Sequence, residues 1–159
     1  MKISLDQVNI RHSYRYGDIG QIVLMHAQQY DFGPMFEPYV AETLAQFYQS
    51  LDTNFERVWI AESNNRIIGS LALKRTGEFA QLRYFIVDPD YRGIGLGKYL
   101  LDLFMDFMKS RNYISSFLLT ESSLDAARYL YEKYGYRHVS TGVTDFGLEE
   151  RRYELHLTP

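Results

Sequence analysis

The segment formed by residues 88–98 constrains the fold of this chain more than any other part of the sequence. The residues before it, 78–87, are rich in β-branched and aromatic side chains and predict a strand. Pro89 ends that strand, because proline lacks a ladder N–H and restricts the residue before it. Three glycines follow, at positions 93, 95 and 97, and a helical pattern then begins. The segment therefore predicts a strand, a glycine-rich turn and a helix in direct succession.

Hydrophobic periodicity predicts the remaining elements in mixed order. Helices are expected over residues 19–30, 35–50, 95–111 and 124–134, with Asp18 as the N-cap of the first and Gly135 just after the last. Strands are expected over residues 8–12, 57–62, 66–73, 78–87, 115–120, 136–144 and 151–157. Ser63, Asn64 and Asn65 predict a hairpin turn. The fold class expected is α/β (α+β).

Length and composition exclude several classes of protein. The 159 residues suit one compact domain, so residues 1–159 are expected to form a single domain. The net charge of -3 lacks the basic excess that nucleic-acid binding requires, so no nucleic-acid partner is expected. The chain has no cysteine, and no ligand spacing links its four histidines, so no metal is expected. No signal peptide or membrane-spanning run is visible, which favours a cytoplasmic location without a membrane partner.

The glycine-rich turn predicts a binding site for a diphosphate. The start of a helix leaves N–H groups without intrahelical acceptors and carries partial positive charge. Glycine lacks the Cβ atom that would keep phosphate oxygens away from the main chain. Arg92 and Lys98 add positive charge at the two ends of the turn.

Two common phosphate-binding motifs do not fit this turn. A Walker A loop requires glycine where Arg92 stands, and serine or threonine where Tyr99 stands. The dinucleotide motif G-x-G-x-x-G requires a third glycine where Lys98 or Leu100 stands. The pattern that does fit is R-x-x-G-x-G, formed by Arg92, Gly95 and Gly97.

That pattern resembles the coenzyme A loop of the GNAT N-acetyltransferase superfamily, and the preceding FIVDPDYRG, residues 85–93, is similar to that family's strand and turn. The sequence ARYLYEKYGY, residues 127–136, is similar to the family's helix end A-x-x-x-Y-E-K-x-G-F. Shorter segments at 18–20, 59–62, 82–83, 119–121 and 146–147 resemble the acetyltransferase half of proteins that fuse a MarR-type DNA-binding domain to a GNAT domain. No winged-helix segment precedes the domain, so a free-standing copy is expected.

The resemblance implies the GNAT acyl-CoA N-acyltransferase fold, in which a mixed, mostly antiparallel sheet of six to seven strands is flanked by about four helices. It implies acetyl-CoA as the cosubstrate and a primary amine of a small molecule or a protein as the acceptor. Related domains often pair, so a homodimer is an open alternative. The residues implied for coenzyme binding are Phe85, Ile86, Val87, Arg92, Gly93, Ile94, Gly95, Leu96, Gly97, Lys98, Leu124, Ala127 and Tyr131.

Tyr131 occupies the family position for the catalytic acid, which protonates the departing thiolate. The resemblance also implies that the N–H group of Val87 polarises the thioester carbonyl. Two positions depart from the family pattern. Leu124 stands where many members have an asparagine that contacts the coenzyme, and Gln81 stands where many have a glutamate that relays a proton from the amine. Candidates for the missing base are Glu78, His26 and Glu121.

Several alternatives remain open at this level. The aromatic residues Tyr30, Phe32, Phe36 and Tyr39 predict either an acceptor pocket or ordinary core packing. The charged run 149–152 is expected to be a solvated turn or a strand edge without a function. A non-catalytic acetyl-CoA sensor is the main rival to an enzyme, and a nucleotide-binding α/β domain is a distant third.

Overall fold

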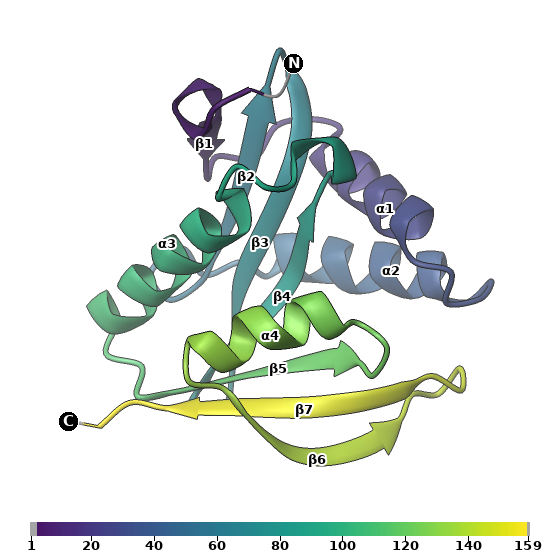
Figure 1. Ribbon diagram of the computed structural model, residues 1–159, viewed down its shortest axis with the longest axis vertical. Coiled ribbons are helices and arrows are strands. Elements are labelled where there is room, and N and C mark those ends of the chain that lie inside the picture. The colour runs from purple at the N-terminus through teal and green to yellow at the C-terminus, as the bar shows by residue number, and fades with distance from the viewer. Residues whose placement is uncertain (1–2, 159) are drawn as a thin grey trace.

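Seven strands form one mixed sheet in the computed structural model, which describes residues 3–158 (Figure 1). The strand order is β1-β2-β3-β4-β5-β7-β6, and only β4 and β5 pair in parallel. The strands are β1 (Asn9–Arg11), β2 (Arg57–Ser63), β3 (Arg66–Thr76), β4 (Phe79–Val87), β5 (Ser115–Glu121), β6 (Arg137–Val143) and β7 (Glu149–His156). The helices are α1 (Asp18–Gln29), α2 (Phe36–Gln49), α3 (Leu96–Ser110) and α4 (Asp125–Lys133), with short 3-10 turns at Leu5–Gln7 and Pro89–Tyr91.

The helices cover both faces of the sheet and bury two apolar clusters. On one face, α3 and α4 pack on the sheet around residues such as Trp59, Phe104 and Tyr136. On the other face, α1 and α2 pack through Leu44 and Phe47. None of the helices within residues 3–158 has both the length and the apolar character needed to cross a membrane. The sheet therefore has two packed faces, as expected for an α/β fold.

The predicted elements agree with the structure to within a few residues at their ends. Asn64 and Asn65 both have positive φ, of 51° and 58°, as a tight two-residue hairpin turn requires. Gly135, with φ of 98°, follows α4 as predicted. Asp18 as an N-cap was wrong: Gly17 is the N-cap and Asp18 is the first helical residue. The charged run 149–152 is not a turn, because β7 begins at Glu149, which pairs with Val143.

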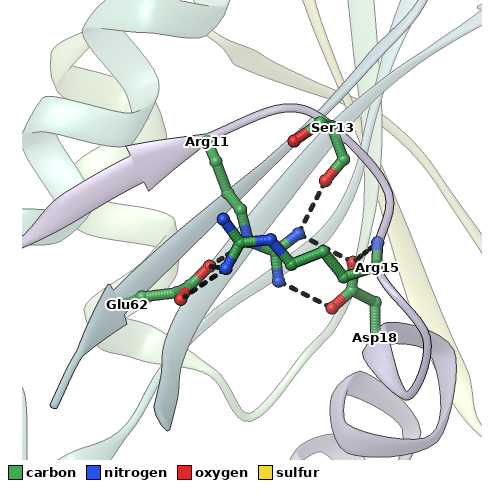
Figure 2. A network of polar contacts seen from close by, with 5 residues as sticks. All are labelled: Arg11, Ser13, Arg15, Asp18 and Glu62. Carbon is green, nitrogen blue, oxygen red and sulfur yellow. Dashed lines mark hydrogen bonds and ion pairs between the residues drawn. The ribbon is translucent and has the colours of Figure 1, made fainter. Parts of the chain in front are cut away.

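Asp18 is taken out of the capping position by a network of ion pairs that joins three segments (Figure 2). The guanidinium of Arg11 in β1 donates to both carboxylate oxygens of Asp18, at 2.7 and 2.8 Å, and also to Glu62 in β2. The backbone N–H of Arg15 donates to Asp18 at 2.8 Å. Arg11 is 9% exposed and Asp18 2% exposed. The network therefore fastens the start of α1 to the edge of the sheet.

The strands β4 and β5 pair over three residues only, from Ala80↔Ser116 to Leu82↔Leu118. Beyond this point β4 continues beside β3, and β5 continues beside β7, which it pairs along its whole length. Figure 1 shows the two strands diverging. The sheet consequently opens between residues 83–87 and residues 119–121.

A β-bulge in β4 lies where the strands part. The register between β3 and β4 shifts between Ser70↔Ile86 and Ala72↔Arg83, so β4 contains an extra residue. Tyr84 has φ of 52°, in the left-handed region that non-glycine residues rarely adopt. The hydroxyl of Ser70 donates to the Tyr84 carbonyl at 2.6 Å, and the Tyr84 hydroxyl donates to Thr43 Oγ1 at 2.8 Å. These contacts from both ends of Tyr84 hold the bulge in place.

We expect Asp18→Ala to lower the free energy of unfolding by about 3 kcal/mol, since Arg11 would keep its buried charge but lose its bidentate partner. Arg128→Ala is the control, because it removes an exposed ion pair with Asp125 and should cost less than about 1 kcal/mol. Urea denaturation measures both. Equal, small losses would show that the network does not stabilise the fold.

We expect Ser70→Ala to cost about 1–3 kcal/mol, because the fully buried Tyr84 carbonyl would lose its hydrogen-bond donor. Ser110→Ala is the matched control, since Ser110 is exposed and donates to a carbonyl at the end of α3. Thermal denaturation of the two variants tests the difference. Wild-type stability in Ser70→Ala would mean that the bulge is held by the other contacts of β4.

Candidate active site

A cavity of about 790 Å³ lies between the parted strands. Residues 81–87 of β4 and residues 119–121 of β5 form two of its walls. The glycine-rich turn and the first half of α4 close one end, and α1, α2 and the β6–β7 connection line the other. Its volume is in the usual range for small-molecule sites, about 300–1,000 Å³.

The glycine-rich turn presents a row of backbone donors at one end of this cavity. Gly93 and Gly95 have φ of 83° and 87°, and α3 begins directly after them at Leu96. The N–H groups of residues 93–98 have no hydrogen-bond acceptor within residues 3–158. Such donors at the positive end of a 15-residue helix favour an anionic group. The turn thus has the open N–H donors and the helix start on which the prediction of a diphosphate site depends.

Two hydrogen-bonded contacts hold the turn in position. The Asp88 carboxylate accepts from the Asp90 N–H at 2.9 Å and pairs with Arg66 at 2.6 Å. At the other side, Arg92 Nη2 donates to Gln29 Oε1 at 3.0 Å. The turn is therefore tied to both β3 and the end of α1.

Not every residue of the turn lines the cavity. Arg92, Gly93, Gly95, Leu96 and Gly97 line it, whereas Ile94 packs toward the core and Lys98 pairs with Asp102 at 2.9 Å on the surface. A Cβ atom on Gly97 would lie 3.4 Å from Phe85 Cζ and 3.8 Å from Leu130 Cδ2. Glycine at this position allows α3 to approach both β4 and α4 closely.

Tyr131 lies on α4 and faces the cavity opposite β4. It is 6% exposed, with ring contacts at 6.1 Å to Phe85 and to Tyr136. Its hydroxyl makes no hydrogen bond within residues 3–158. Burial, together with the nearby hydroxyl of Tyr30, raises the pKa of Tyr131 well above its ordinary value. The phenol therefore keeps its proton at neutral pH, as a general acid must.

The residues considered for the missing base lie in different places. Gln81 lines the cavity, and its Oε1 accepts from Thr76 at 2.9 Å. Glu121 also lines it, but its carboxylate accepts from the N–H of Ser123 at 2.9 Å. Glu78 is exposed in the turn before β4 and does not line the cavity.

His26 on α1 is buried and lines the cavity. Its Nδ1 donates to the Ile22 carbonyl at 2.8 Å, which leaves Nε2 as the acceptor. Burial lowers the pKa of His26, so the imidazole is neutral at neutral pH. His26 can accept a proton only weakly under these conditions.

The aromatic set predicted from the sequence lines the cavity, so core packing alone does not explain it. Tyr30 and Phe32 are stacked with centroids 5.2 Å apart, and Phe36 contacts both rings. Tyr39 contacts Phe146 from the β6–β7 connection at 5.3 Å. Leu124 and Ala127 line the cavity from the start of α4.

Three further cavity residues were missed or dismissed at the level of sequence: Arg83, Phe146 and Glu150. The run that contains Glu150 had been expected to have no function. A usable signal existed, because polar residues at 150, 152 and 154 alternate with the apolar Tyr153 and Leu155. That alternation predicts a strand with one polar face, but not what lies opposite that face.

Comparison with known proteins agrees with this geometry. A sequence model of the acetyltransferase (GNAT) family matches residues 8–136. The N-acetylaspartate synthetase of Xenopus tropicalis is 34% identical over 106 residues, which are 61% of this chain and 39% of that protein. The chain thus spans well under half the length of this curated relative.

Solved structures show the same fold. An acetyltransferase from Streptococcus agalactiae superimposes with a TM-score of 0.76 and 24% identity, covering 96% of this chain and all of that one. A putative streptothricin acetyltransferase from Bacillus anthracis, solved in complex with acetyl coenzyme A, gives a TM-score of 0.61 with 24% identity over 70% of this chain and 69% of its own. The family match over residues 8–136 shows that this chain belongs to the acetyltransferase (GNAT) family, and the seven-stranded fold agrees with it.

Proposed function

We propose that residues 1–159 form a single domain that transfers the acetyl group of acetyl-CoA to a primary amine of a small molecule or a protein. The observation that carries the proposal is one cavity in which the unpaired N–H groups of residues 93–98 and the protonated phenol of Tyr131 meet between two parted strands. This arrangement suits a ligand with an anionic diphosphate at one end and a reacting thioester further in.

The coenzyme would be held chiefly by the main chain. The N–H groups of residues 93–97 would receive the diphosphate, Arg92 would add its side-chain charge, and Lys98 would contribute charge from the surface. Phe85, Ile86 and Val87 would offer main-chain groups to the pantetheine arm, because the sheet has no neighbouring strand on that side. Leu124 and Ala127 would contact the same arm from α4. Ile94 would contribute its backbone, since its side chain packs inward.

Tyr131 would act as the acid that protonates the departing sulfur. Its hydroxyl has no competing partner within residues 3–158, and like any tyrosine it holds its proton throughout the neutral range, while burial raises its pKa further. The N–H of Val87 would polarise the thioester carbonyl and stabilise the charge that develops on its oxygen. Neither residue requires a metal, and no cluster of three or more potential metal ligands occurs within residues 3–158.

Membership in the GNAT family does not identify the acceptor substrate. The curated relative from Xenopus tropicalis is by its name a synthetase of N-acetylaspartate, but this chain spans 39% of it. The likeness to MarR-GNAT fusions stays a prediction, as do the cytoplasmic location and a homodimer. Gln81 stands where many family members have a glutamate, and it cannot act as a base. This replacement favours a second candidate function, a non-catalytic acetyl-CoA sensor.

Calorimetry with acetyl-CoA, followed by an assay of thiol release against a panel of amines, separates the two functions. We expect binding together with thiol release that depends on the acceptor. Binding without release across the panel would favour the sensor, and the absence of binding would contradict the proposed cosubstrate.

Tyr131→Phe is expected to lower kcat by about 100-fold or more, because a general acid typically contributes about 10²–10⁴-fold. The affinity for acetyl-CoA should stay close to that of the wild type. Tyr129→Phe is the matched control on the same helix, since Tyr129 is 63% exposed and lies outside the cavity. Steady-state kinetics and calorimetry measure the two parameters. An unchanged kcat in Tyr131→Phe would remove this residue from the mechanism.

A further inference from the structure

The part of the cavity farthest from the glycine-rich turn has a wall that the family motifs do not describe. We call it the outer wall, and it is formed by Tyr39 of α2, Arg83 of β4, Leu119 of β5, Phe146 of the β6–β7 connection and Glu150 of β7. Strand pairing sets Glu150 opposite Glu121, and Leu119 opposite Arg152, in the antiparallel ladder of β5 and β7. Directly paired residues have side chains on the same face of a sheet. Glu150 therefore lies on the face that carries Leu119.

We propose that Glu150 binds the ammonium group of the acceptor and takes its proton, and that the acceptor is a primary amine whose aromatic body lies against Tyr39 and Phe146. This inference rests on the proposed function and adds the residue that replaces the family's glutamate and the chemical class of the substrate.

Among the carboxylates that line the cavity, Glu150 is half-buried and makes no hydrogen bond or ion pair within residues 3–158, although Arg83 acts on it electrostatically. Glu121 is occupied by the turn after β5, through Ser123. Asp125 is mostly exposed and pairs with Arg128 at 3.3 Å. Glu149 is exposed at the edge of the cavity. A half-buried carboxylate without a hydrogen-bonded partner is destabilised, and an ammonium group that donates to it would compensate its lost hydration.

The charged groups around Glu150 support this role. Burial raises its pKa, and Arg83 on β4 opposes the rise. On its own strand the next residue of the same face, Arg152, is committed to Glu154 at 2.7 Å. Across the ladder, Glu121 adds negative charge and thereby favours a cation. Because desolvation lowers the pKa of an ammonium group while it raises that of a carboxyl, the two values approach each other in the cavity, and proton transfer becomes easier.

Arg83 is already engaged with neighbouring side chains. Its Nη2 donates to the Tyr39 hydroxyl at 3.2 Å, and its guanidinium lies over the Tyr84 ring at 4.7 Å. Arg83 therefore positions Tyr39 in addition to its electrostatic effect on Glu150. An acceptor with additional carboxylates would meet Glu121, Glu149 and Glu150, which are arranged to repel it.

The aromatic part of the outer wall has room for an apolar body. The rings of Tyr39 and Phe146 are 5.3 Å apart and tilted by 50°, and Tyr39 and Leu119 remain 39% and 42% exposed. Exposed aromatic surface in a cavity is stabilised when another ring covers it, in edge-to-face or offset packing. An amine one or two carbons from an aromatic ring would place its nitrogen beside Glu150 while its ring contacts Tyr39.

With these residues, every proton and every bond of the acetyl transfer is accounted for. The acceptor ammonium gives one proton to the Glu150 carboxylate, and the neutral nitrogen attacks the thioester carbon. The C–N bond forms, the C–S bond breaks, and the sulfur receives the proton of Tyr131. The second proton that leaves the nitrogen restores Tyr131, and Glu150 releases its proton to solvent.

The test uses the full chain, with 2-phenylethylamine, spermidine, aspartate and aniline as acceptors. Glu150→Gln should lower kcat/KM for 2-phenylethylamine by about 100-fold or more at neutral pH, with the affinity for acetyl-CoA unchanged. The loss should shrink for aniline, which is uncharged at neutral pH, and at alkaline pH. Asp106→Asn is the control, because it removes an exposed carboxylate on α3 outside the cavity and should behave as the wild type.

A binding measurement separates this inference from the proposed function. Protein saturated with coenzyme A is titrated with 2-phenylethylamine, and Glu150→Gln should weaken the affinity at least about tenfold, whether or not any amine is acetylated. If no amine is acetylated but Glu150→Gln still binds 2-phenylethylamine more weakly, the proposed catalysis is contradicted while the ammonium-binding site is supported. Equal binding by both proteins, or a preference for aspartate or spermidine over 2-phenylethylamine, would overturn the inference.

Discussion

The parting of β4 from β5 is the constraint on which the rest of the site depends. At the root of the opening, the Ser116 hydroxyl donates to the Ala80 carbonyl at 2.6 Å and accepts from Tyr136 at 2.7 Å. Past Leu82 and Leu118 each strand has only one partner within the described residues, so the inner edge of β4 and that of β5 expose main-chain groups to the cavity. Unpaired strand edges are normally covered or blunted, because they bind other chains. Here they form a narrow cavity instead.

The charges around the cavity divide it into two ends. At one end, the helix start and the open N–H groups of residues 93–98 favour an anion. At the other end, Glu121, Glu149 and Glu150 favour a cation. Tyr131 lies between them, in surroundings that keep it neutral. Such a gradient of electrostatic potential would bind an anionic cosubstrate at one end and a cationic acceptor at the other, with the reacting groups of both near the Tyr131 phenol.

Contacts far from the cavity also determine its shape. The buried pair of Arg11 and Asp18 fixes the start of α1 against the sheet, and two turns later the same helix places His26 in the cavity wall. At the end of α1, Gln29 accepts from Arg92 and so connects this helix to the glycine-rich turn. A change at the remote end of α1 would therefore be transmitted to the coenzyme side of the site.

Sequence alone was sufficient for the parts of the site whose residues are neighbours along the chain. Proline after a strand, closely spaced glycines and the start of a helix act on adjacent residues, so they predicted the open N–H groups of the turn. The resemblance of residues 127–136 to a family motif implied the role of Tyr131, whereas its place on α4 followed from a local signal, since Gly135 ends the helix just after it. The order of helices and strands followed from periodicity for the same reason.

The outer wall was decided only by the tertiary structure. Arg83 and Glu150 are far apart in sequence, and their meeting depends on the order in which β5 and β7 join the sheet. The face that each residue of β4 presents depends on the bulge at Tyr84, a positive φ at a non-glycine residue that no local pattern indicates. Strand periodicity assigns a side chain to one of two faces, but what covers that face is set by packing between distant segments. The open N–H groups at one end of the cavity were therefore determined by local sequence, and the charged and aromatic wall at the other end by the fold.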